Sequence, residues 1–293
     1  MFWRALELLP GESPRLRPLG HALGDRLSIA ANYYDMSFGA FSAEALAEIR
    51  REVYGRDIGQ HSWLTAERQE EFATLAGFGR DTALLEVGCG SGGPALFLCE
   101  TIGLSVTGID TNESGIAAAT ADAARRRLSA RATFRCMDGA GRLSFGDASF
   151  DAIECIDAIN HLPDRASVLR EWRRVLRPGG VLLFTDPVVV TGAVTAEEFA
   201  ARSAIGHFVF VPPGKNEQLL REAGFELVKS EDATNDEAMI ARRRLAAREK
   251  RRDALIAGEG ADNFAATQAF LSAVHALSDS RRLSRIMYLA RKP

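Results

Sequence analysis

The sequence lacks the features that mark secreted, membrane-spanning and nucleic-acid-binding proteins. Its 293 residues include only four cysteines, and none of them forms a Cys-x-x-Cys pair, so we expect neither a disulfide framework nor a metal site. No stretch approaches about 18 uninterrupted apolar residues, so no transmembrane helix is expected. The start of the chain has no apolar core long enough for a signal peptide. With a formal net charge of -3, the chain has no general attraction to nucleic acid or to an anionic membrane. These absences predict a cytoplasmic protein that binds neither nucleic acid nor membrane.

The strongest positive pattern is an apolar run that ends in an acid and then in a cluster of glycines. Residues 84–93 read LLEVGCGSGG, and the next apolar residues recur at helical spacing. This pattern predicts a strand, a tight turn and a helix whose N-terminus faces the ligand above the turn. Gly88, Gly90 and Gly93 match G-x-G-x-x-G, and Asp110 follows at the spacing of about 20 residues that is typical of a ribose-binding acid. Taken alone, this fingerprint also fits an enzyme that uses NAD.

From residue 84 onward, short apolar stretches alternate with helical patterns. Strands are predicted at 84–87, 105–109, 132–136, 150–156, 181–185, 225–229 and 283–290. Helices are predicted at 94–102, 113–128, 165–176, 235–257 and 262–279. Such alternation predicts an α/β fold with a doubly wound, mostly parallel, Rossmann-like sheet of seven strands. Its ligand is expected at the carboxyl ends of the strands, near the first strand.

Four regions follow from this pattern. We expect an N-terminal helical cap region at 1–80, a ligand-binding core at 81–234, a helical insertion at 235–280 and a final core strand at 281–293. The insertion is too long for a simple connector, so we interpret it as a lid or a subunit contact. A homo-oligomer could form through the N-terminal region or through this insertion.

Three features distinguish the ligand from NAD. Glu86 stands two residues before Gly88, where a carboxylate can reach a cationic amine but would repel a pyrophosphate. Asp138 follows the third strand, where it can accept a hydrogen bond from an adenine amino group. No second glycine turn follows the fourth strand, as a second mononucleotide-binding half would require.

Four segments, in order, resemble signatures of the class I S-adenosylmethionine-dependent methyltransferases. Residues 85–92 resemble their motif I, residues 106–110 their second-strand motif, and residues 147–151 and 175–180 their later motifs. The resemblance implies S-adenosylmethionine as cofactor, S-adenosylhomocysteine as product, and a seventh, antiparallel strand beside the fifth, which residues 283–290 can supply. It implies a cofactor site made of Glu86, Gly88, Gly90, Gly92, Asp110, Thr111, Asn112, Met137, Asp138, Gly139 and Cys155. In the alternative reading, Gly92 and Gly93 serve only helix packing, and Asp110 and Asp138 are solvated turn acids.

The implied reaction is in-line transfer of a methyl group to nitrogen or oxygen of a small organic molecule. His161, just after the fourth strand, is the candidate catalytic base or acceptor-orienting group, although it could equally cap or pack at the next helix. Candidate substrate-binding residues are Tyr33, Tyr34, His61, Trp63, Asp157, His207 and Phe208. The basic run 242–252 is interpreted as a solvated helix face, with an anchor for an acidic acceptor or a nucleic-acid contact as alternatives.

The sequence leaves the acceptor open. Residues 184–187 resemble N-methyltransferases of the sarcosine and dimethylglycine type, whereas the helical insertion resembles the layout of cyclopropane fatty acid synthases. The alternatives are a C-methyltransferase acting on an isoprenoid or an activated ring, a non-catalytic regulatory protein that binds S-adenosylmethionine, and a nicotinamide-dependent oxidoreductase.

Overall fold

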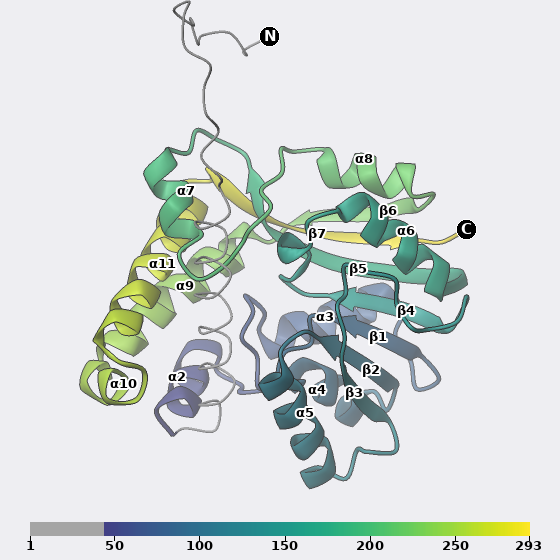
Figure 1. The fold of residues 1–293 in the computed structure, drawn as a ribbon, viewed down its shortest axis with the longest axis horizontal. Coiled ribbons are helices and arrows are strands. Elements are labelled where there is room, and N and C mark those ends of the chain that lie inside the picture. The colour runs from purple at the N-terminus through teal and green to yellow at the C-terminus, as the bar shows by residue number, and fades with distance from the viewer. Residues whose placement is uncertain (1–43) are drawn as a thin grey trace, which may run out of the picture.

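One sheet of seven strands organises the protein (Figure 1). The computed structural model describes residues 44–293. The strands are β1 (Ala83–Val87), β2 (Ser105–Asp110), β3 (Ala132–Cys136), β4 (Phe150–Cys155), β5 (Leu176–Val190), β6 (Glu226–Asp232) and β7 (Leu283–Arg291). They lie in the order β3-β2-β1-β4-β5-β7-β6, and β7 is antiparallel to both of its neighbours. The predicted doubly wound, mostly parallel sheet with an antiparallel last strand beside the fifth is confirmed.

Helices cover both faces of the sheet and one of its ends. They are α2 (Glu44–Tyr54), α3 (Ala66–Ala76), α4 (Gly93–Thr101), α5 (Glu113–Arg125), η1 (Ile159–His161), α6 (Arg165–Val175), α7 (Ala196–Arg202), α8 (Lys215–Glu222), α9 (Thr234–Glu249), α10 (Arg252–Glu259) and α11 (Ala261–Asp279). Side chains of α3 and α4 pack on one face of the sheet, and side chains of α6 and α8 pack on the other. None of the helices in this part of the chain combines the length and the apolar character that crossing a bilayer needs.

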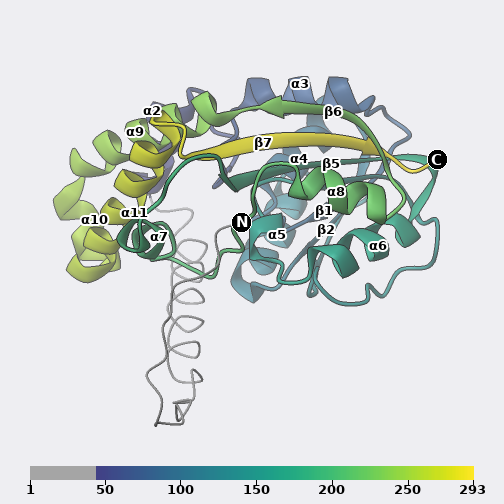
Figure 2. The same cartoon turned by 90° about the horizontal axis from the view of Figure 1, so that it is seen from above.

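A helical cap, formed by α2, α7, α9, α10 and α11, stands beyond the carboxyl ends of the parallel strands (Figures 1 and 2). Its apolar core combines side chains of four of these helices with Trp63, which lies between α2 and α3. Ile49, Ile240 and Phe270, from α2, α9 and α11, are each 5% exposed or less. Helices far apart in the sequence therefore form one layer over the edge of the sheet where a ligand is expected.

The basic run 242–252, which spans the end of α9 and the start of α10, contacts α2. Arg251 forms ion pairs with Glu48 and Glu52 of α2 at 2.9 and 2.8 Å, and Lys250 also pairs with Glu52. Arg243 donates a hydrogen bond to the carbonyl oxygen of Val53 at 3.2 Å. Lys250 and Arg243 are exposed, as the interpretation of this run as a solvated face expects, but Arg251 is partly buried and these residues also contact α2.

Three elements or groups of elements differ from the prediction. The fifth strand, predicted at 181–185, extends over fifteen residues, because a register shift between Asp186 and Val189 accommodates Pro187 within the pairing to β7. The long connection between β5 and β6 contains two helices, α7 and α8, that the sequence pattern did not predict. The helix predicted at 235–257 is divided into α9 and α10 near Lys250.

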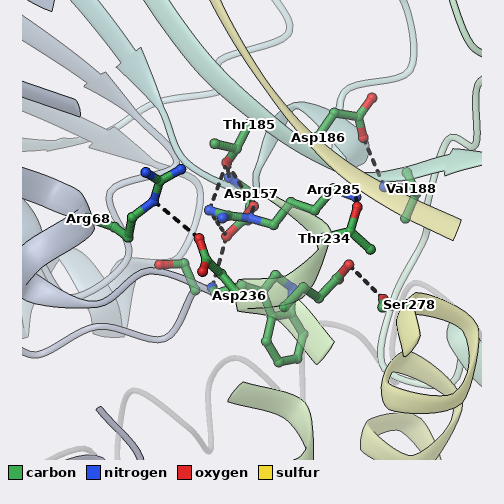
Figure 3. Close-up of polar contacts among 12 residues, drawn as sticks. Arg68, Asp157, Thr185, Asp186, Val188, Thr234, Asp236, Ser278 and Arg285 are labelled. Atoms are coloured by element: carbon green, nitrogen blue, oxygen red, sulfur yellow. Dashed lines mark hydrogen bonds and ion pairs between the residues drawn. The ribbon is translucent and has the colours of Figure 1, made fainter. Parts of the chain in front are cut away.

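A buried ion pair joins the central sheet to the cap (Figure 3). Arg285 of β7 is fully buried, and its Nε donates to Asp157 Oδ1 at 2.7 Å. The same carboxylate accepts hydrogen bonds from the hydroxyl of Thr185 at 2.7 Å and from the amide of Trp63 at 2.9 Å. The amide of Arg285 donates to the hydroxyl of Thr234, which begins α9, at 3.1 Å. Asp157 and Arg285 therefore connect β4, β5 and β7 with Trp63 and with the start of α9.

Replacing Arg285 by methionine should lower the free energy of unfolding by about 3–5 kcal/mol, because Asp157 then stays buried without its cation. Urea unfolding at neutral pH measures the change. Arg125→Ala is the matched control, since this side chain is 72% exposed in its pair with Asp122 and should contribute no more than about 1 kcal/mol. A loss at Arg285 as small as that at Arg125 would contradict the central role of this pair.

Candidate functional site

A cavity of about 1020 Å³ opens at the carboxyl ends of β1, β2, β3 and β4. Its walls are the loops that follow these four strands, together with residues 59–62 before α3 and residues 206–207 after α7. The order of the sheet reverses beside β1, so the cavity lies at the topological switch point, where open α/β sheets bind their ligands.

The glycine turn after β1 forms the floor of the cavity. Gly88 has a φ of 76°, and a Cβ atom there would lie 2.5 Å from the Cβ of Ala158, so a side chain is excluded on both grounds. The amide of Gly88 donates to the carbonyl oxygen of Ile109 at 2.8 Å, which fixes the turn against β2. Gly88 and Gly90 both line the cavity, where they leave backbone accessible to a ligand.

Gly92 and Gly93 serve packing. A Cβ on Gly92 would lie 2.8 Å from the side chains of Ala119 and Phe134, and one on Gly93 would lie 2.3 Å from the carbonyl oxygen of Ile58. Neither glycine is among the residues that line the cavity. For Gly92, the alternative of simple packing therefore accounts for the glycine better than contact with a cofactor.

Asp110 ties the glycine turn to the loop after β2. Its Oδ2 accepts a hydrogen bond from the amide of Gly90 at 2.8 Å, and its Oδ1 accepts one from the amide of Asn112 at 2.9 Å. Burial raises the pKa of Asp110 although these two amides lower it. Each carboxylate oxygen can accept a second hydrogen bond, so Asp110 can hold the turn and still bind hydroxyl groups in the cavity. Thr111 and Asn112 line the cavity beside it, and the side chain of Asn112 caps α5.

Glu86 presents a buried carboxylate at the base of the cavity. The side chain lines the cavity although the residue is only 4% exposed, and its Oε2 has no hydrogen-bond partner within residues 44–293. Burial raises its pKa well above the usual value, and the negative charges of Glu154 and Asp110 add to this effect. A buried acceptor of this kind suits a cationic donor such as an ammonium group.

The loops after β3 and β4 complete this end of the cavity. Met137, Asp138 and Gly139 line it, and Asp138 is exposed, with its Oδ1 accepting a hydrogen bond from the amide of Ala140 at 2.8 Å. Cys155 is fully buried and does not line the cavity, whereas the next three residues do. Of the residues predicted for the cofactor, Gly92 and Cys155 therefore lie behind the wall and all the others line it.

The histidine end of the cavity is the part of its wall where His161 and His207 meet, and His61 also lines the cavity. His161 Nδ1 lies 2.8 Å from the carbonyl oxygen of His207. Because a carbonyl only accepts, Nδ1 carries the proton, and in the neutral ring Nε2 is then an acceptor. Burial lowers the pKa of His161 to about 4, and the charge of Arg202 contributes to the shift. Burial and Arg244 lower the pKa of His61 to about 3, so both rings are neutral near pH 7.

The remaining predicted substrate residues have three different positions. Trp63 and Phe208 pack in the cap on either side of Phe270, with ring centroids 6.4 and 6.3 Å from it, and do not line the cavity. Phe208 also contacts the ring of His161, at 4.7 Å between centroids. Asp157 lines the cavity, but its carboxylate is used by Arg285. Tyr33 and Tyr34 lie outside the described residues.

The sequence patterns gave no role to two buried charged residues near the site, Glu154 and Arg285. Arg285 was readable as a lone charge inside the apolar strand 283–290, whereas Glu154 shares residues 150–155 with a second acid, Asp151. Neither signal identifies a partner, which lies on another element in both cases. Residues 44–293 contain no group of three or more His, Cys, Asp or Glu side chains placed to hold a metal ion.

Comparison with known proteins agrees with this geometry. A family model described as a methyltransferase domain matches residues 85–184. The chain is 30% identical over 203 residues to 27-O-demethylrifamycin SV methyltransferase of Amycolatopsis mediterranei, covering 65% of this chain and 74% of that protein. It is 30% identical over 213 residues to phosphoethanolamine N-methyltransferase of Triticum aestivum, covering 72% of this chain but only 41% of that protein.

A solved structure supports the fold. Phosphoethanolamine N-methyltransferase 2 of Haemonchus contortus, in complex with phosphomonomethylethanolamine and S-adenosylhomocysteine, matches with a TM-score of 0.73 and 19% identity. The match covers 89% of this chain and 60% of that one, and it bears on the fold alone. The family follows from the similarity to the Amycolatopsis enzyme, together with the matched domain and the order of the sheet. This chain belongs to the class I S-adenosylmethionine-dependent methyltransferases that act on small molecules.

Proposed function

We propose that the acceptor is a small organic molecule methylated on oxygen or nitrogen at the histidine end of the cavity, with His161 as the base for a hydroxyl acceptor. One observation carries this proposal: the hydrogen bond from His161 Nδ1 to the carbonyl oxygen of His207, which makes Nε2 the basic nitrogen. An amine acceptor reacts through its own lone pair and needs this base less, so a role for His161 favours oxygen.

The opposite end of the cavity suits the cofactor. When bound, S-adenosylmethionine supplies an electrophilic methyl group for in-line displacement. We assign Glu86 to the ammonium group and Asp110 to the ribose hydroxyls, because both are buried acceptors that line the cavity. Asp138 is assigned to the adenine amino group, with Met137, Gly139, Thr111 and Asn112 around the base and with Gly88 and Gly90 giving backbone access.

The helical cap is proposed to exclude water from the site and to orient the acceptor. Phe208 packs against His161 and against Phe270 of α11, which restricts the orientation of the imidazole ring. We infer that helices α9 to α11, with α2, act as a lid that excludes water and orients the acceptor toward His161. His61 and His207, which both line the cavity, are proposed to contact the acceptor.

We also propose that the protein works in the reducing environment of the cytoplasm. All four cysteines are free thiols, and three of them are buried. Burial raises the pKa of Cys89 well above the usual value, which keeps this thiol beside the cofactor turn protonated and unreactive.

Asp110→Ala should weaken binding of S-adenosylhomocysteine by about tenfold to a hundredfold, because it removes hydrogen bonds to a charged group and releases the amide of Gly90. Asp110→Asn, which keeps one acceptor oxygen, should lose less. Isothermal titration calorimetry measures the dissociation constants. His161→Gln is the comparison, and its dissociation constant should stay within about twofold of the wild-type value. Equal losses of affinity at the two positions would refute the assignment of Asp110 to the cofactor and of His161 to the acceptor.

His161→Gln should lower kcat for a hydroxyl acceptor by about a hundredfold, near the lower limit for a general base, because a pKa of about 4 makes the imidazole a weak base. Since only the neutral ring accepts a proton, the wild-type kcat should not fall through loss of this base until the pH approaches 4. A screen of hydroxyl and amine acceptors, followed by kinetics at several pH values, tests both statements. Unchanged kcat in the variant would exclude His161 as the base, and absence of turnover with every acceptor would favour a non-catalytic binding protein.

A further inference from the structure

Glu86 has a second carboxylate as its direct neighbour in the sheet. Strands β1 and β4 run parallel, and Glu86 is in register with Glu154. Neighbouring strands are about 4.8 Å apart, and residues in register point to the same face. Leu84 and Ala152, two positions earlier on each strand, pack together in the core beneath α3 and α4, which identifies that face. Both carboxylates therefore lie on the side of the sheet covered by α3 and α4.

Few groups surround this pair, and none of the described ones carries a positive charge in contact with it. Glu154 is fully buried, and its two oxygens both accept hydrogen bonds from Nε2 of Gln69 on α3, at 3.0 and 3.1 Å. Asp110 adds negative charge from β2, and Cys89 and Cys99 contribute thiols from the glycine turn and from α4. Within residues 44–293, neither Glu86 nor Glu154 forms an ion pair with lysine or arginine.

Ionising both carboxylates at once costs free energy, because two buried negative charges on neighbouring strands repel each other. Burial raises the pKa of Glu154 to about 7, although the hydrogen bonds from Gln69 lower it. Burial and the charge of Glu154 raise the pKa of Glu86 well above its usual value. Interacting carboxylates titrate as a pair, and the first proton to bind is shared between them. The burial of both carboxylates and their places in register on neighbouring strands therefore favour keeping a proton on the pair in the empty site.

We propose that Glu154 is a positioning residue for the cofactor's ammonium group and acts through Glu86: the two carboxylates share one proton in the empty site and release it when the ammonium group binds. This inference rests on the proposed place of the ammonium group at Glu86. Glu86 lines the cavity, and its buried Oε2 has no hydrogen-bond partner within residues 44–293, so this carboxylate has acceptor capacity left for a ligand. Gln69 holds Glu154 by both oxygens, which keeps it beside Glu86.

The proton balance of this step is simple. One carboxyl O–H bond of the pair breaks, and the proton passes to the solvent. The ammonium N–H then donates to the carboxylate of Glu86, and its positive charge compensates the second negative charge of the pair. Since binding releases a proton, affinity must rise with pH wherever the empty site is protonated, by up to about tenfold per pH unit.

Titration calorimetry with S-adenosylhomocysteine tests the coupling. This probe carries the ammonium group without the sulfonium charge, and between pH 6.0 and 7.5 its amine stays mostly protonated. Measurements in two buffers of different ionisation enthalpy give the number of protons released. The wild type should release between about half a proton and one proton, with binding tighter at pH 7.5 than at pH 6.0. Binding without proton release would overturn the inference alone, whereas absence of binding would overturn the proposed cofactor site.

Three variants distinguish a positioning role of Glu154 from a purely structural one. Glu154→Gln removes one charge from the pair and should move the midpoint of proton release about one pH unit or more lower. Gln69→Met removes the hydrogen bonds that favour the charged form of Glu154 and should move the midpoint higher. Asp151→Asn, on the same strand but at its half-exposed start, is the matched control and should leave the midpoint unchanged. A Glu154→Gln midpoint equal to that of the wild type, or shifts of the Glu154→Gln and Gln69→Met midpoints in the same direction, would refute the role of Glu154.

Discussion

The carboxylate of Asp157 is the point on which the geometry of the site depends. Asp157 follows β4 and has a left-handed φ of 53°, a conformation that aspartate tolerates better than most residues. The residue also lines the cavity. Arg285, Thr185 and the amide of Trp63 bind its two oxygens. The next residue, Ala158, packs against the space left by Gly88. A shift at Asp157 would therefore move the glycine turn, the entry to α3 and the start of α9 together. We infer that this side chain, which the sequence suggested as a substrate ligand, is structural.

Charge is separated along the cavity. Carboxylates gather at the end formed by β1 and β2, where Glu86 and Asp110 are buried with raised pKa values. His161 and His207 meet elsewhere in the wall, and burial lowers the pKa values of His161 and of His61, so both rings are neutral. The physical cause is the same at both ends, because burial disfavours the charged form of acids and bases alike. A cation is attracted to the first end, and a neutral imidazole that can accept a proton stands at the second. This arrangement matches a reaction in which a cationic donor meets an acceptor that loses a proton.

The cap is formed by contacts between segments that are distant in the sequence. Arg251, between α9 and α10, reaches Glu48 and Glu52 on α2 across about two hundred residues of chain, and exposed ion pairs of this kind contribute little stability each. The apolar core shared by α2, α9 and α11 is therefore the main reason that these helices stay together. The cap also contains a charged pair, Arg202 and Glu237, which lie 3.6 Å apart and are both buried, and the hydroxyl of Ser278 donates to Glu237. Burial raises the pKa of Glu237 to about 7.

The sequence alone determined the features that depend on local geometry. The alternation of strands and helices, the glycine turn after β1 and the place of Asp110 at the end of β2 follow from periodicity and from backbone conformation, which neighbouring residues decide. The tertiary structure decided which buried charges meet. Asp157 and Arg285 are 128 residues apart, and Gln69 and Glu154 are 85 apart, so no local pattern pairs them. The same holds for the partners of the basic run on α9 and for the burial that makes His161 neutral, because partners and burial arise only when distant segments pack together and exclude water.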